Sequence, residues 1–300
     1  MRRVAGWVLT VAGGLVVVLV VAASLVYIVS ERRLNQRYAV TPAAVSVPAD
    51  AASIQRGRHV ALVLAKCGDC HGEDLGGLIV VDAPLFRIVG PNLTAGRGGV
   101  GARLTDADWL RAIRHGVGRD GRALLSMPSE DYFHMSETDL AAVVAYARSV
   151  PPVDRVLPAS QLRFLGRVLL VLGRLPVPAA AVIEHSAPFV PPVPEGATLE
   201  YGRYLALVGC HGCHGPGLSG GRVPGAPREF PPASNITPAG AIGQWTEADF
   251  FRLMREGQRP DGAEVHPFMP IRATAQMTDV EIRALWMYLR SVPPMPYGNR

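Results

Sequence analysis

Hydrophobic positions near the start of the chain form one long uninterrupted run. Between Val4 and Val29 the chain carries no charged residue, and Val, Leu and Ala dominate it. A helix of about 26 residues, at 1.5 Å rise per residue, is long enough to cross the roughly 30 Å hydrocarbon core of a bilayer. We therefore predict a single transmembrane helix over residues 1–30, followed by a linker over residues 31–52. Cleavage as a signal peptide is the alternative, because residues 22–24 are small.

Beyond this run the apolar positions recur at the spacing of amphipathic helices. In the last helix expected in each half, they are Leu140, Val143, Val144 and Ala147, and then Ile282, Leu285, Trp286 and Leu289. Helix N-caps are expected at Thr105, Ser136, Thr246 and Thr278, each with an acidic residue three positions later. Gly116, Gly257 and two Pro-Pro pairs are expected to end these helices.

Few segments show the alternation of apolar and polar residues that is typical of β-strands. Gly- and Pro-rich stretches, such as residues 76–91 and 215–232, are predicted to be loops between the helices. The predicted fold class is all-α.

The two halves of the chain repeat each other with an offset of 141 to 145 residues. The matching segments are Gly57-Arg58-His59 with Gly202-Arg203-Tyr204, Asn92-Leu93-Thr94 with Asn235-Ile236-Thr237, residues 105–109 with 246–250, Met127-Pro128 with Met269-Pro270, and residues 148–152 with 290–294. Each copy has the size of an ordinary domain. We therefore predict two helical domains in tandem, over residues 53–152 and 197–296.

The segment between the two copies, residues 153–196, is rich in Pro, Ala and Val. Its stretch from Leu162 to Leu175 is apolar but contains three arginines, a density of charge that excludes an ordinary second membrane span. A short amphipathic helix is expected here. It lies either on the membrane surface or packed between the two domains, and the sequence leaves both options open.

All four cysteines of the chain lie in two Cys-x-x-Cys-His motifs. The motif residues are Cys67, Cys70 and His71 in the first copy and Cys210, Cys213 and His214 in the second. Such a motif is the attachment signature of c-type haem. Two thiols three residues apart project from one helical turn, so each can form a thioether with a haem vinyl group, and the histidine then faces the iron. We therefore predict two covalently bound haem c groups.

Two other interpretations of these cysteines explain less. A structural zinc site needs four ligands, and each motif offers at most three, with no fourth ligand nearby at zinc-finger spacing. A thioredoxin-like redox pair needs a βαβ context that is missing here, and it leaves the histidine unexplained.

A haem iron held by one histidine needs a second axial ligand to become a six-coordinate electron carrier. Met127 lies 56 residues after His71, and Met269 lies 55 residues after His214; both precede a proline just before the last helix. We predict these two methionines to be the second ligands. A thioether ligand favours ferrous iron and raises its reduction potential.

Other side chains near the two sites are rivals for this role. They are His134 and Met135 in the first copy, and Met254, His266 and Met277 in the second. Met135 and Met277 occupy aligned positions and form the main alternative, but both adjoin the N-cap of the last helix and are expected to pack on it. The remaining histidines, His59, His115, His185 and His211, are expected at the surface or beside haem propionates.

Both copies resemble class I cytochrome c domains, and the pair resembles the multihaem cytochrome c subunits of membrane-bound alcohol and gluconate dehydrogenases. The most specific stretches are residues 233–238, 243–250 and 267–270. The resemblance implies axial ligation by the histidine of each motif together with Met127 and Met269. Those subunits typically carry three haem domains, whereas this chain has two.

The resemblance also implies two packing details. A glycine of the first helix should meet an aromatic residue of the last, Gly57 with Tyr146 and Gly202 with Tyr288. A proline carbonyl should orient each axial histidine. Pro91 fits this role in the first copy, but the second copy has Ser234 at the aligned position and departs from the pattern.

The charge of the chain narrows its expected partners. The net charge is +5 and the pI is about 9.3 without cofactors, and the four propionates of two haems would offset much of this excess. Basic runs with interleaved aromatic residues are missing, so nucleic-acid binding is excluded. The expected partners are redox proteins, namely a dehydrogenase, an oxidase or a soluble cytochrome, together with the membrane that holds the N-terminal helix.

These observations predict a membrane-anchored dihaem c-type cytochrome that relays single electrons between a membrane or periplasmic donor and a downstream acceptor. It is expected to be an electron-transfer protein rather than an enzyme. Because c-type haem is attached outside the cytoplasmic membrane, we expect a single-pass protein with its domains on the periplasmic side. The alternative is a dihaem enzyme such as a cytochrome c peroxidase, which needs an exchangeable sixth ligand.

Overall fold

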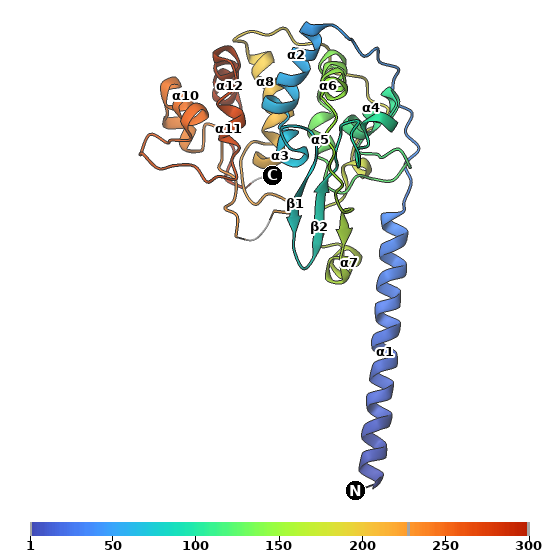
Figure 1. The fold of residues 1–300 in the computed structure, drawn as a ribbon. Helices are drawn as coiled ribbons and strands as arrows, with labels where there is room; N and C mark the ends of the chain where they lie inside the picture. Colours follow the sequence, from blue (N-terminus) through green and yellow to red (C-terminus); the bar gives the residue numbers. More distant parts are fainter. Residues whose placement is uncertain (1, 227–228, 299–300) are drawn as a thin grey trace.

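Helix α1 (Arg2–Leu34) projects alone from the rest of the chain (Figure 1). The computed structural model describes residues 2–226 and 229–298. The part of α1 from Gly6 to Leu34 is long and apolar enough to cross a membrane, and its most hydrophobic window is not buried inside the protein. The helix continues beyond the predicted residues 1–30, because the Glu, Arg and Leu residues that follow are good helix formers.

The first copy of the repeat contains five α-helices and two short turns of other helix types. They are α2 (Ala51–His59), the π-helical turn η1 (Val60–Leu64), α3 (Gly68–His71), the 3₁₀ turn η2 (Gly101–Arg103), α4 (Asp106–His115), α5 (Ser129–Tyr132) and α6 (Glu137–Ser149). The second copy follows the same order with α8 (Leu199–Gly209), α9 (His211–His214), η4 (Ala241–Gln244), α10 (Glu247–Glu256), α11 (Ile271–Thr274) and α12 (Asp279–Ser291). Between the copies lie α7 (Phe164–Val171) and η3 (Ala179–Ala181).

The predicted helix ends are confirmed. Thr105 and Thr246 cap α4 and α10 with reciprocal hydrogen bonds to the acidic residue three positions later. Thr278 caps α12 in the same way, whereas Ser136 caps α6 without the reciprocal bond. Helices α4 and α10 stop at glycines 116 and 257, which adopt the left-handed conformation with φ of 64° and 72°.

A small antiparallel sheet lies outside the all-α prediction. Strands β1 (Leu78–Asp82) and β2 (Phe86–Gly90) form a hairpin, and β3 (Gln161–Leu162) pairs with β2, in the order β1-β2-β3. Both long strands fall inside residues 76–91, so the prediction of a loop there is wrong. They contain several β-branched residues but lack clear alternation, so the glycines and prolines around them dominate the pattern.

The first and last helices of each copy cross at a glycine. A Cβ atom on Gly57 would lie 1.8 Å from the carbonyl oxygen of Ala142 and 3.0 Å from Cβ of Tyr146. In the second copy, a Cβ atom on Gly202 would lie 2.7 Å from Cβ of Tyr288. The glycine–aromatic contacts implied by the resemblance are therefore present, and they let α2 approach α6, and α8 approach α12, backbone to backbone.

Replacing Gly57 with Ala is expected to destabilise the protein by about 3 kcal/mol, since the added methyl group overlaps a helix backbone that cannot move alone. The measurement is the shift of the denaturant midpoint of the purified haem-loaded chain. Gly196→Ala is the matched control, because a Cβ atom there would make an ordinary contact of 3.5 Å with Thr198. Equal midpoints for the two variants would contradict the expected overlap.

Candidate functional site

The first Cys-x-x-Cys-His motif folds into a single helical turn. Cys67 is the N-cap of α3, and Cys70 and His71 lie within it, so all three side chains come from one turn. His71 is buried, and its Nδ1 donates to the carbonyl oxygen of Pro91 at 3.0 Å. This bond leaves the lone pair of the ring on Nε2, the nitrogen that a metal can use. Burial lowers the pKa of His71, which favours the neutral ligand form.

The second motif has the same local geometry. Cys210 is the N-cap of α9, which contains Cys213 and His214. His214 Nδ1 donates to the carbonyl oxygen of Ser234 at 2.8 Å. The departure from proline at this position therefore keeps the hydrogen bond to the histidine, because the acceptor is a backbone carbonyl, which every residue has.

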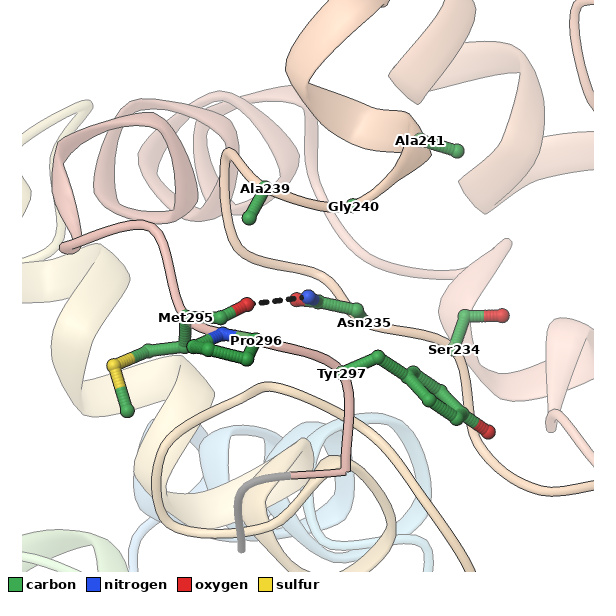
Figure 2. A pocket seen from close by; sticks show the side chains of 8 residues that line it. All are labelled: Ser234, Asn235, Ala239, Gly240, Ala241, Met295, Pro296 and Tyr297. Atoms are coloured by element: carbon green, nitrogen blue, oxygen red, sulfur yellow. Dashed lines mark hydrogen bonds between the residues drawn. The ribbon is translucent and has the colours of Figure 1, made fainter.

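The repeated Asn-x-Thr segments hold these carbonyls in place. The side chain of Asn235 accepts hydrogen bonds from the backbone N–H and the hydroxyl of Thr237, and it donates to the carbonyl oxygen of Met295 at 2.8 Å (Figure 2). Asn92 makes the corresponding bonds to Thr94 and to Val153. Each asparagine ties the loop behind the histidine to the chain that follows the last helix. The pocket in Figure 2 is lined by Ser234, Asn235 and Met295 among others, so it belongs to the segments that hold the carbonyl oxygen of Ser234 in place.

The electrostatics of the thiols argue against a redox pair. Burial, followed by the neighbouring Cys70, raises the pKa of Cys67 to about 12. Burial also raises the pKa of Cys70 and of Cys210. Dithiol redox motifs instead lower the pKa of the attacking thiol. Within the described part of the chain, no group of three or more His, Cys, Asp or Glu side chains is placed to hold a metal ion.

The predicted methionine ligands lie at the edge of the core, in the loops before α5 and α11. Met127 and Met269 are partly buried, and they pack against the same hydrophobic cluster as Cys67 and Cys210. The rival methionines lie inside this cluster: Met135 is 0 % exposed, and Met254 and Met277 are buried. His266 is exposed, and its Nδ1 accepts the backbone N–H of Phe268.

One buried polar group of the first copy fits a haem carboxylate. Trp109 is 3 % exposed, and among the described residues its indole N–H has no hydrogen-bond partner. A buried N–H without an acceptor is costly, so a bound group that supplies a carboxylate relieves this cost. Phe250 occupies the aligned position of the second copy and requires no acceptor. In each copy, two thiols, an imidazole whose Nδ1 binds a backbone carbonyl oxygen, and an edge methionine complete a donor set suited to haem c.

The two copies meet in a pseudo-symmetric network of hydrogen bonds. His59 Nε2 lies 2.8 Å from Glu281 Oε1, and the hydroxyl of Tyr204 donates to Asp139 Oδ2 at 2.6 Å. His59 aligns with Tyr204, and Asp139 aligns with Glu281. Each first helix therefore binds the acidic residue in the first turn of the other copy's last helix.

A second set of hydrogen bonds in this network lies within each copy. Arg56 binds Asp139 at 2.8 Å, and the hydroxyl of Tyr201, at the position aligned with Arg56, donates to Glu281 at 3.2 Å. Burial alone would raise the pKa of Glu281, but the hydrogen bond from His59 and the other donors hold it below its usual value. Glu281 is 2 % exposed, and its carboxylate accepts hydrogen bonds from His59 of the first copy and Tyr201 of the second. It therefore links the two copies.

The two haem-attachment motifs lie close together across this interface. The Lys66 ammonium, directly before Cys67, donates to the carbonyl oxygen of Gly209, directly before Cys210, at 3.0 Å. Helix α5, which follows Met127, contacts α8 and α9 of the other copy. Its Asp131 hydrogen-bonds the backbone of Gly212 inside the second motif, and burial raises the pKa of this carboxyl to about 7.

Sequence reasoning missed the roles of two histidines. His59 is a link between the copies rather than a surface residue. His115 is buried, with its Nδ1 3.1 Å from Nδ1 of His185. The signal for His59 was available: it is a polar residue on the first helix whose aligned partner, Tyr204, is also able to hydrogen-bond an acid.

Comparison with known families matches both copies of the repeat. Residues 52–146 match the family described as "Cytochrome C oxidase, cbb3-type, subunit III", and residues 199–293 match the family described as "Cytochrome c". Both matches contain one Cys-x-x-Cys-His motif and the methionine that follows it.

Similar proteins include cytochrome subunits of several dehydrogenases. The chain is 31% identical over 273 residues to the fructose dehydrogenase cytochrome subunit of Gluconobacter japonicus, covering 84% of this chain and 54% of that protein. It is 28% identical to the cytochrome c subunit of the quinone alcohol dehydrogenase of Gluconacetobacter polyoxogenes, over 85% of this chain and 59% of that protein. The chain thus spans little more than half the length of these relatives.

A shorter relative has a matching number of haems. The "Diheme cytochrome c-type" protein of Cereibacter sphaeroides is 30% identical over 208 residues, covering 63% of this chain and 66% of that protein. The chain accordingly contains two cytochrome c domains, each with one covalently bound haem c, and its relatives include cytochrome c subunits of fructose, alcohol and gluconate dehydrogenases.

Proposed function

We propose that this protein is a membrane-anchored electron relay with His/Met-ligated haem in both domains. The observation that carries the proposal is the repetition of one complete donor set at aligned positions. Each haem iron, when bound, supplies one-electron redox chemistry. His71 and His214 are held by backbone carbonyls, and Met127 and Met269 lie at the edge of the core. The rival methionines are buried within the core.

The interface between the domains is suited to passing electrons from one site to the other. Lys66, Asp131 and Glu281 hold the two attachment motifs in one fixed arrangement. A fixed arrangement keeps the distance between the redox centres constant, and it lowers the structural reorganisation that accompanies a change of charge. The protein therefore needs neither a substrate pocket nor a titrating catalytic group for this task.

The proposed location is the cytoplasmic membrane, with α1 as a single-pass anchor and both domains on the periplasmic side. The support for the anchor is the length and apolar composition of α1 and its separation from the core. A dehydrogenase is the proposed donor, because several relatives carry that name, and an oxidase or a soluble cytochrome is the proposed acceptor. Tethering raises the effective concentration of such partners.

The test is the ferric absorption spectrum of the detergent-purified protein, measured together with its haem content. Two haems per chain and a far-red methionine–iron band of two-haem intensity are expected. Half that intensity, or a high-spin spectrum, would show that one iron is open or differently ligated. That result would replace the relay by an enzyme such as a peroxidase.

A further inference from the structure

Helix α7 contacts the end of α1 through charged and aromatic side chains, among them the rings of Tyr27 and Phe164, whose centroids lie 6.0 Å apart. Arg33 Nη1 donates to the carbonyl oxygen of Leu170 at 2.6 Å, near the C-terminal end of α7, where a cation is favoured by the helix dipole. In return, Arg167 Nη1 donates to Glu31 Oε2 at 2.8 Å. The expected amphipathic helix is therefore α7, and it packs against α1. This position favours the membrane surface over a place between the two domains.

These contacts fix the level of α7 relative to a membrane. The apolar part of α1 ends at Val29, and the residues that bind α7, Glu31 and Arg33, follow within four positions. When α1 spans a bilayer, these charges lie at the level of the lipid headgroups. Helix α7 then lies at the lipid–water interface as well.

One face of α7 packs closely against the hairpin. The large apolar side chains of α7 lie on its other faces and are exposed. Gly166 is buried, and a Cβ atom there would lie 2.3 Å from the carbonyl oxygen of Leu85 in the hairpin turn. Phe164, Leu165 and Leu172 are 42, 55 and 64 % exposed. In an ordinary water-soluble domain such residues would face the core.

The hairpin adds exposed apolar residues on the same side of the molecule. Ile79 and Val80 of β1 are 45 and 37 % exposed. Strand β3 pairs with β2 and leads directly into α7, so the sheet and the helix form one unit. Figure 1 shows this unit on the side of the body from which α1 extends. We call Ile79, Val80, Phe164, Leu165 and Leu172 the α7 patch.

We infer that the α7 patch rests on the lipid bilayer, as a second membrane contact beside the anchor. The inference depends on the proposed function, because it assumes that α1 spans the membrane. Lipid is the occupant favoured by the structure, since the patch continues the surface of α1 at the level where α1 leaves the membrane. Arg174, exposed just after α7, suits anionic headgroups, whereas Arg163 and Arg167 are paired with Asp82 and Glu31.

This second contact has a consequence for the relay. A single helix followed by a linker would let the two domains swing freely. With α7 on the bilayer, the first domain is held in one orientation, and the interface network carries the second domain with it. Partners in the same membrane then meet a constant face of the protein.

The test uses the full haem-loaded chain in lipid nanodiscs with no partner protein. Since haem attachment consumes the native thiols, one added cysteine takes a fluorescent label. The three variants are Val18→Cys in the span, Leu165→Cys in the patch and Leu199→Cys as the control, the latter two being comparably exposed at 55 and 49 %. Iodide in the water and brominated lipid in the bilayer act as quenchers.

We expect iodide to quench the Leu165 label about fivefold less than the Leu199 label, and brominated lipid to quench it clearly, as for an interfacial helix. A shielded Val18 label with a Leu165 label as open to iodide as the control would leave the anchor standing and overturn the patch. Water exposure at both positions would refute anchor and patch together. Lipid contact at Leu165 with a water-exposed Val18 label would refute the anchor and, with it, a contact beside the anchor.

Discussion

Changing Met127 to His is expected to halve the far-red methionine–iron band and to lower the reduction potential of one haem by a few tenths of a volt. Axial ligands set haem potentials over a range of about 0.8 V, and imidazole stabilises ferric iron more than a thioether does. The measurements are the ferric spectrum and a potentiometric titration of the full chain. Met269→His should act in the same way on the other haem.

The matched control for this prediction is Met135→Leu. Met135 is 0 % exposed inside the core, and a swap of similar volume costs less than about 1.5 kcal/mol. Both potentials and the full band intensity should survive. If Met135→Leu removed the band and Met127→His left it intact, the ligand would be Met135, and the assignment of the edge methionine would be wrong.

Replacing Glu281 with Leu is expected to destabilise the protein by about 3 kcal/mol and to loosen the domain interface. The side chain accepts from His59, from Tyr201 and from the backbone N–H of Thr278. Its removal takes this acceptor away from the buried hydroxyl of Tyr201 and from the partly buried His59. The measurements are the denaturant midpoint and amide hydrogen exchange, which should accelerate in α2 and α12. Glu247→Ala is the control, because its pairing with Arg283 is solvent-exposed. We expect it to be nearly neutral.

The stabilisation by Glu281 should depend on pH in one direction only. Its pKa in the folded protein lies below the usual value of 4.5, so the carboxylate contributes stability above about pH 4.5. That contribution is lost as the pH falls from 4.5 through the folded-state pKa. The stability difference between the wild type and Glu281→Gln should therefore shrink on acidification. A difference that grew below pH 4.5 would show that the carboxylate is not the stabilising form.

The network around Glu281 also explains how a duplicated domain can bind its own copy. Aligned positions of both copies carry a donor on the first helix and an acid on the last, so one set of contacts is used twice around a pseudo-two-fold axis. The exchange of His59 for Tyr204 shows that the two halves of the interface have diverged. The geometry has been kept with different donor chemistry.

The sequence by itself determined the features that depend only on a few neighbouring residues. The two Cys-x-x-Cys-His turns, the helix caps at Thr105 and Thr246, and the apolar run of α1 are local patterns, and local backbone geometry suffices to interpret them. The repeat offset extended this reasoning to the paired Met127 and Met269. Their role as ligands remains a prediction that the spectrum tests.

Only the tertiary structure decided the features that join distant segments. His59 and Glu281 are 222 residues apart, the carbonyl that orients His214 belongs to a serine, and α7 lies against α1 instead of between the domains. The hairpin lacks alternation because burial does not alternate along its strands: the adjacent Ile79 and Val80 are both exposed in β1, and the adjacent Val89 and Gly90 are both buried in β2. Contacts of this kind depend on which surfaces remain exposed after the helices form. No periodicity along a single chain records that outcome.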